Sequence, residues 1–171
     1  VIRAGKNLKI IANYGAGYDS VDIAAAAACG VPVTNIPETV TDATAELAIG
    51  LMLAVSRRIG EMNLRLRKED SASLFGMGRF MGSTLRGRTL GIIGCGRIGG
   101  RVAEMAKALG MRVIAYSRRG VPGHIAENAE LATLLAESDV ISLHCPSTPE
   151  TRHLINAGTF AQMKDGACLI N

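Results

Sequence analysis

The sequence has no tryptophan, and tyrosine and phenylalanine are rare, although nearly half of its residues are apolar. Its core must therefore be built from aliphatic side chains and alanine. The four cysteines (Cys29, Cys95, Cys145 and Cys168) are far apart and form no C-x-x-C pair, so the pattern of a disulfide framework or a cysteine metal site is missing. We expect reduced thiols, no metal and a cytoplasmic protein.

Long apolar runs and concentrated charge are missing as well. The longest apolar stretch, residues 47–55, is too short to cross a bilayer. The net charge of +4 comes from scattered basic residues, and no dense basic stripe carries interleaved aromatic side chains. We therefore expect neither a membrane nor a nucleic acid as a partner.

The most informative stretch is residues 89–110. Its apolar run, 90–93, is typical of a buried parallel strand. Gly94, Gly96 and Gly99 then match G-x-G-x-x-G, and apolar residues follow at helical spacing. The first glycine permits a tight turn, the second lets the backbone approach a pyrophosphate, and the third lets the helix pack closely on the strand. An ordinary glycine turn is the alternative, but the order of strand, motif and helix predicts a dinucleotide site at the helix N-terminus.

The residues after the second predicted strand, 112–116, indicate which dinucleotide fits. NAD-binding units usually carry an acidic residue about twenty positions after the glycines, where it binds ribose hydroxyls. Here Ser117, Arg118 and Arg119 stand at that place, with no carboxylate. Guanidinium groups bind a 2′-phosphate by charge-assisted, bidentate hydrogen bonds, so we expect NADP(H) to be preferred and NAD(H) to be possible. The alternative is that the two arginines are ordinary surface charges.

Strand and helix signals alternate along the whole chain, which predicts a doubly wound α/β fold with a parallel sheet. Residues 1–40 are expected to form one partial domain, with a helix over 23–29 that Ser20 or Asp22 caps. A single long helix from about Thr41 to Arg67 is expected, with Thr41 as its cap and with apolar residues that nearly encircle it over 47–55, so that this half is buried. It is expected to form the linker, 41–70, between this part and a dinucleotide domain over 71–171. The other expected elements are strands over 8–12, 31–35, 139–143 and 167–170, a glycine-rich loop over 13–19, an irregular excursion over 71–87, a helix within 125–137 and a helix that Asn156 caps and that runs through Met163.

Taken together, these segments resemble the D-isomer-specific 2-hydroxyacid dehydrogenase family, and most of all its glyoxylate/hydroxypyruvate reductases. The residues that carry the resemblance are 13–19, 41–47, 89–99, 144–156 and 166–171, and the likeness extends over nearly the whole chain. It implies a Rossmann-type NAD(P) domain beside part of a flavodoxin-like substrate domain. It also implies hydride transfer between a nicotinamide and a small 2-oxo or 2-hydroxy acid, in a homodimer.

The resemblance further implies roles for single residues. Backbone amides of Ala16 and Gly17 are expected to bind the substrate carboxylate, although glycines in such a loop also serve simply as turn residues. Cys145 and Pro146 are expected closest to the cofactor in their loop. The cofactor contacts are expected at Thr44, Gly94, Cys95, Gly96, Arg97, Ile98, Gly99, Ser117, Arg118, Arg119, Cys145, Pro146 and Thr151.

The catalytic Arg, Glu and His of the family would lie beyond Asn171, so we expect an interior fragment with little turnover of its own. His124, His144 and His153 do not match the catalytic histidine, and His144 is expected to have a structural role. Two other functions stay open. One is a non-catalytic dinucleotide-binding or sensing module, corepressor-like or degenerate, and the other is a formate- or phosphite-oxidising relative.

Overall fold

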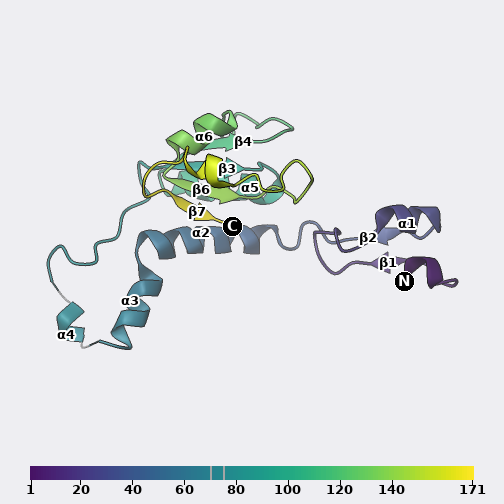
Figure 1. Ribbon diagram of the computed structural model, residues 1–171, viewed down its shortest axis with the longest axis horizontal. Helices are drawn as coiled ribbons and strands as arrows, with labels where there is room; N and C mark the ends of the chain where they lie inside the picture. Colours follow the sequence, from purple (N-terminus) through teal and green to yellow (C-terminus); the bar gives the residue numbers. More distant parts are fainter. Residues whose placement is uncertain (70, 75) are drawn as a thin grey trace. The chain divides into compact units, whose positions relative to one another are not determined.

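The computed structural model describes residues 1–69, 71–74 and 76–171. It contains two compact units, Val1–Ala43 and Thr44–Asn171 (Figure 1). The predicted domain boundaries at residues 40 and 70 stay predictions, and Asp70 itself lies outside the described residues, as does Phe75 within the expected excursion over 71–87.

The first unit is a small parallel β-α-β arrangement. A 3-10 turn, Ile2–Ala4, precedes strand β1 (Ile11–Ala12), which pairs in parallel with β2 (Val33–Thr34). Between them lies α1 (Ile23–Ala28). The strands are shorter than expected because their pairing extends over only two residues of each. Of the two expected caps, Asp22 is the one that the structure supports, since its carboxylate accepts a hydrogen bond from the Ala25 backbone N–H at 2.9 Å.

The helix expected over 41–67 is two helices, so that prediction is wrong. Helix α2 (Thr41–Ser56) and helix α3 (Ile59–Leu66) are separated by Arg58, whose backbone is left-handed with φ 56°. The backbone N–H of Ser83 donates to the Ser56 carbonyl oxygen at 2.7 Å, so a distant segment provides a partner at the end of α2. A short helix, α4 (Ser71–Leu74), follows.

Two further expectations for α2 are also wrong. Thr41 is already the first helical residue, and its buried hydroxyl has no hydrogen-bond partner among the described residues, so it does not cap the helix. Only one face of α2 is buried, by residues at helical spacing (Ala45, Ala48 and Met52). Leu47, by contrast, is 62% exposed, so the apolar stretch is not enclosed all round.

The second unit is built on a five-stranded, wholly parallel sheet in the order β5-β4-β3-β6-β7. The central strand β3 is buried along its full length, and its Leu90 is paired with Val113 on one side and Val140 on the other. The strands are β3 (Thr89–Ile93), β4 (Arg112–Tyr116), β5 (Glu127–Asn128), β6 (Val140–Leu143) and β7 (Cys168–Ile170). The expected parallel sheet is confirmed for this unit.

Helices cover both faces of this sheet, as a doubly wound fold requires (Figure 1). Helix α5 (Arg97–Ala108) packs on one face together with α2, where Val102, Ala103 and Ala106 meet Leu90 and Ile92 in one apolar cluster. Helix α6 (Leu131–Glu137) packs on the other face. Its Leu134 and Leu135 are fully buried against Ile93, Ile114 and Ile141, and such burial stabilises by about 2 kcal/mol per side chain.

One helix boundary and one strand differ from expectation. The helix expected within 125–137 is confirmed as α6, but the edge strand β5 that precedes it beside β4 was not predicted. Helix α7 (Ala157–Phe160) ends before Met163. The predicted cap is confirmed: the Asn156 side chain accepts hydrogen bonds from the backbone N–H groups of Gly158 and Thr159, at 2.9 and 3.2 Å.

The close approach of α6 to β3 at Gly91 gives a stability prediction. A Cβ atom at Gly91 would lie 2.7 Å from Leu134 Cδ2 and would overlap Ser138 Oγ, and both side chains are fully buried. We expect Gly91→Ala to lower the free energy of unfolding by about 1–3 kcal/mol, measured by urea denaturation. The control is Gly50→Ala in α2, where a Cβ meets no atom within 4 Å and is expected to stabilise by up to about 1 kcal/mol. Equal effects of the two substitutions would contradict this packing.

Candidate functional site

The turn between β3 and α5 contains two glycines that the protein itself requires. Gly94 has φ +97°, and a Cβ there would lie only 2.5 Å from the Cys145 backbone nitrogen. A Cβ at Gly99 would overlap the Gly94 carbonyl oxygen, so only glycine lets α5 start this close to β3. The tight turn and the close helix packing expected from these two positions are therefore confirmed.

Gly96 differs from its two neighbours in the motif. A Cβ at this position would meet no atom within 4 Å, and its φ of −87° is open to any residue. Gly96 is the N-cap residue of α5, and no side chain caps this helix. Packing within the described protein thus gives no reason for a glycine here, whereas a ligand that approaches the start of the helix does.

A hollow of about 610 Å³ lies at the carboxyl ends of β3, β4 and β6, and we call it the sheet-end hollow. The chain runs from β3 to β4 on one side and later returns to β6 on the other, which makes this a topological switch point, the usual ligand position in open α/β sheets. The hollow is lined by Ile93, Gly94, Cys95, Gly96, Tyr116, Ser117, Arg118, Arg119, His144, Cys145, Pro146, Glu150, Thr151 and Leu154.

The sheet-end hollow brings together most of the residues for which the sequence predicts cofactor contacts. Nine of them line it: Gly94, Cys95, Gly96, Ser117, Arg118, Arg119, Cys145, Pro146 and Thr151. Arg97, Ile98 and Gly99 form the first turn of α5, just beyond the lining. Thr44 lies in the first turn of α2 and is not part of the lining.

Other lining residues were missed by sequence reasoning, and Glu150 matters most because it is the one carboxylate in the lining. It follows β6, far along the chain from Arg118, which it contacts. Arg118 Nη1 lies 3.5 Å from Glu150 Oε2, across 32 residues of sequence. Both side chains are well exposed, at 56% and 64%. The only signal in the sequence is that loops after neighbouring parallel strands meet at one edge of the sheet.

The loop that carries Glu150 is held by its own side chains. The Thr151 hydroxyl donates to the Pro146 carbonyl oxygen at 2.6 Å and accepts from the Thr148 backbone N–H at 2.8 Å. A hydrogen bond from Thr148, more than the charge of Arg118, lowers the pKa of Glu150 below its ordinary value. Glu150 therefore carries its negative charge at neutral pH.

Two titratable groups of the sheet-end hollow, His144 and Cys95, are neutral. Ser142 Oγ lies 2.8 Å from His144 Nε2, and Ser142 itself is fully buried at the end of β6. Burial lowers the pKa of His144 below its ordinary 6.5, so the imidazole is neutral at physiological pH. Burial also raises the pKa of the Cys95 thiol, which keeps it protonated. The fixed charges of this region are thus those of Arg118, Arg119 and Glu150.

In the first unit, the loop after β1 presents backbone donors. The Asn13 amide donates to the Gly17 carbonyl oxygen at 2.7 Å, and the Asn35 amide donates to that of Ala16 at 2.8 Å. These bonds fix the loop through its carbonyl groups. Within the described residues, the backbone N–H groups of Ala16 and Gly17 donate to no protein atom. An anionic group is the natural partner for two such donors.

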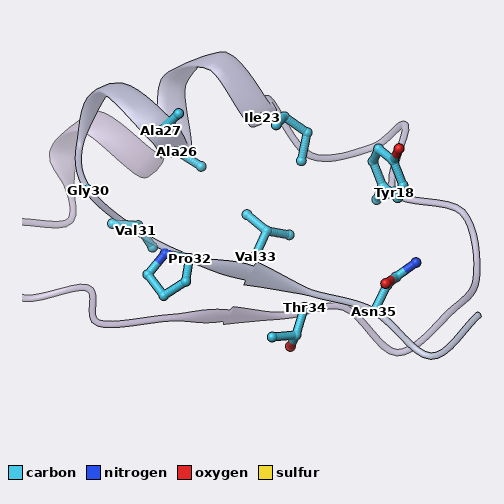
Figure 2. A pocket seen from close by; sticks show the side chains of 10 residues that line it. All are labelled: Tyr18, Ile23, Ala26, Ala27, Gly30, Val31, Pro32, Val33, Thr34 and Asn35. Atoms are coloured by element: carbon cyan, nitrogen blue, oxygen red, sulfur yellow. The ribbon is translucent and has the colours of Figure 1, made fainter.

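The first unit also has an apolar hollow between α1 and β2, where Ala26, Val31 and Val33 face inward (Figure 2). Two of its polar lining residues, Tyr18 and Asn35, lie toward one end (Figure 2). No charged side chain lines it, so it offers no counter-ion for an ionic substrate. Among the residues that the structure describes, no three His, Cys, Asp or Glu side chains are grouped to hold a metal ion. None of the described helices is long and apolar enough to span a membrane.

Comparisons with known proteins agree with this geometry. A family model described as "D-isomer specific 2-hydroxyacid dehydrogenase, NAD binding domain" matches residues 49–171. Glyoxylate reductase of Thermococcus litoralis is 48% identical, with 96% of this chain and 52% of that protein covered. Hydroxypyruvate reductase of Thermotoga maritima is 44% identical, with 100% of this chain and 55% of that protein covered. The chain thus spans about half the length of the curated relatives it matches.

A solved structure shows the same architecture. An acyclic imino acid reductase, Bsp5, in complex with NADPH and D-Arg superposes with a TM-score of 0.87 at 32% identity. The match covers 96% of this chain and 52% of that one.

The buried His144 gives a prediction about pH. Its native pKa is below 6.5, so as pH falls below about 6.5 the unfolded chain binds a proton that the native chain does not. The free energy of unfolding should therefore fall with pH in this range, by up to about 1 kcal/mol between pH 6.5 and 5.5, and be insensitive to His144 above it. In His144→Gln this contribution should vanish. Urea unfolding at several pH values measures the slope, and an unchanged slope in the variant would refute the assignment.

Proposed function

The chain belongs to the D-isomer-specific 2-hydroxyacid dehydrogenase family, and from this we propose that it is the cofactor-binding part of an NADP(H)-dependent reductase of small 2-oxo acids. Glyoxylate and hydroxypyruvate are the proposed substrates, because curated relatives at 48% and 44% identity are reductases of these two acids. The observation that carries the proposal is the sheet-end hollow, which combines a ligand-sized gap beside Gly96 with two arginines at the end of β4.

The residues of the sheet-end hollow fit a dinucleotide from end to end. We assign the pyrophosphate to the start of α5, where Gly96 leaves room and where Cys95, Arg97 and Ile98 supply the surrounding backbone. We assign the nicotinamide side to Cys145 and Pro146, with Thr44 and Thr151 as further contacts. When bound, the cofactor supplies a hydride; the role of these residues is to hold and orient it and to exclude water.

The cations at the end of β4 support a preference for NADP(H) over NAD(H). Ser117, Arg118 and Arg119 line the sheet-end hollow next to each other, and the guanidinium groups of the two arginines suit a dianionic 2′-phosphate. A relative of the same fold was solved in complex with NADPH, which is consistent with this preference. We propose binding of NAD(H) as a weaker alternative.

The substrate carboxylate is assigned to the loop of the first unit. The backbone N–H groups of Ala16 and Gly17 donate to no other described atom, and the loop that presents them is fixed by Asn13 and Asn35. Reduction of a 2-oxo acid also needs a proton donor and a cation near the carbonyl. We assign neither role to a residue of this chain, since His144 is held neutral beside Ser142.

The remaining organisation follows from the family. We propose that residues 1–40 are part of the substrate domain, that 41–70 link the two domains, and that 71–171 form the dinucleotide domain of a homodimer. The division of the described chain at Ala43 supports the first of these boundaries. The four cysteines are free thiols, which supports a reducing compartment such as the cytoplasm.

Gly96 provides a test that separates binding from folding. Gly96→Val places a side chain in open space, so we expect the melting temperature to change little while NADPH binding is lost. The assay on the complete gene product is oxidation of NADPH with glyoxylate and with hydroxypyruvate. Activity in the wild type that Gly96→Val abolishes supports the proposal. Equal activity in the two proteins, or no oxidation by either acid in the wild type, would overturn it.

Arg118 provides a test of the cofactor preference. Removing one charge-assisted, bidentate partner of a phosphate costs about 10- to 100-fold in affinity, so Arg118→Asp should raise the Kd of NADPH by this factor. The Kd of NADH should stay within about threefold, because its ribose carries no phosphate. Titration by nicotinamide fluorescence measures both constants. Arg101→Asp, an equal change of charge on the exposed side of α5, is the control. An unchanged NADPH/NADH ratio in Arg118→Asp would contradict the assignment.

A further inference from the structure

Glu150 places a negative charge in a region whose other fixed charges are positive. Its carboxylate reaches Arg118 from a loop on the far side of β3, since Arg118 follows β4 and Glu150 follows β6. The separation of 3.5 Å is long for an ion pair, and both groups are exposed. Arg118 is therefore held only loosely and can change its partner at small cost.

This pair differs from an ordinary surface ion pair in the same unit. Arg112 contacts Glu127 and Glu137 at 2.7 Å each, and these contacts raise the pKa of Arg112; none of the three lines the sheet-end hollow. Arg118 and Glu150 both line it, and they form the weaker contact. The pair of Arg118 and Glu150 contributes little to stability. Because it lies where a phosphorylated ribose is proposed to bind, its main effect is on the affinity for the ligand.

The loop conformation holds this carboxylate in place. The hydroxyl of Thr151 bridges Pro146 and Thr148, and Thr148 contacts Glu150. Glu150 is therefore charged and lies within reach of Arg118 in the lining of the sheet-end hollow. A carboxylate in this position acts oppositely on the two dinucleotides: it accepts a hydrogen bond from a ribose hydroxyl, and it repels a 2′-phosphate.

We propose that Glu150 is a specificity-determining residue that narrows the preference for NADP(H) over NAD(H). It neutralises part of the charge of Arg118, it opposes a 2′-phosphate, and it supplies the hydroxyl-binding carboxylate that is absent after β4. This inference rests on the proposed function, because it assumes that the adenosine ribose of a nicotinamide dinucleotide lies beside Arg118. The preference for NADP(H) over NAD(H) would then depend on Glu150 in the loop after β6 as well as on the arginines in the loop after β4.

The test is the ratio of the two dissociation constants in Glu150→Gln, which keeps the shape of the side chain and removes its charge. The repulsion between two like charges about 5 Å apart in water weakens the binding of one by the other several-fold. We expect the Kd of NADPH to fall about 3- to 10-fold and that of NADH to stay or rise, measured by fluorescence titration of the complete protein at low salt. High salt should reduce the effect, since the pair is exposed.

Two controls separate the possible failures. Glu104→Gln removes a similarly exposed carboxylate that pairs with Arg101 on α5. The ratio of the NADPH and NADH dissociation constants in this variant should match that of the wild type. If Glu150→Gln leaves the NADPH/NADH ratio of dissociation constants unchanged while Arg118→Asp changes it, the role of Glu150 is overturned and the proposed cofactor site stays intact. If the wild type binds neither dinucleotide, the proposed function fails and the role of Glu150 fails with it.

Discussion

The second unit depends on the contact between the backbone of Gly94 and that of Gly99. Because no side chain separates them, α5 starts directly at the end of β3, with its first turn against the strand that it covers. This contact sets how far Val102, Ala103 and Ala106 reach into the core, and the missing side chain of Gly94 also lets the Cys145 backbone pass close by. The same contact therefore sets the packing of one sheet face and the shape of the sheet-end hollow.

Elements whose signal is local were predictable from sequence. Strand β4 was expected over residues 112–116 and has these bounds, and the caps at Asp22 and Asn156 depend on residues two or three positions away. The errors lie where a distant partner decides. The end of α2 involves a hydrogen bond from Ser83, and strand β5 exists because Ile114 and Ala115 offer it an edge. No pattern within 41–67 or 125–130 contains that information.

The candidate site follows the same division. The glycine turn and the arginines after β4 are short stretches, and the sequence placed them together at one end of the sheet, where nine of the thirteen expected cofactor contacts line one hollow. Glu150 was missed because its relevance comes from the order of strands: β3 separates β4 from β6, so loops far apart in sequence meet across it. Strand order is a property of the whole sheet, and no single segment encodes it.

The three glycines of the turn record different kinds of selection. Gly94 and Gly99 are required by the fold, because any side chain there meets backbone atoms. Gly96 has no such packing requirement, and the space that it leaves at the start of α5 is where we propose that a ligand binds. A descendant of this protein that retained the architecture but lost its ligand would keep Gly94 and Gly99 while Gly96 drifted to other residues. Position 96 thus distinguishes an inherited scaffold from a working binding site.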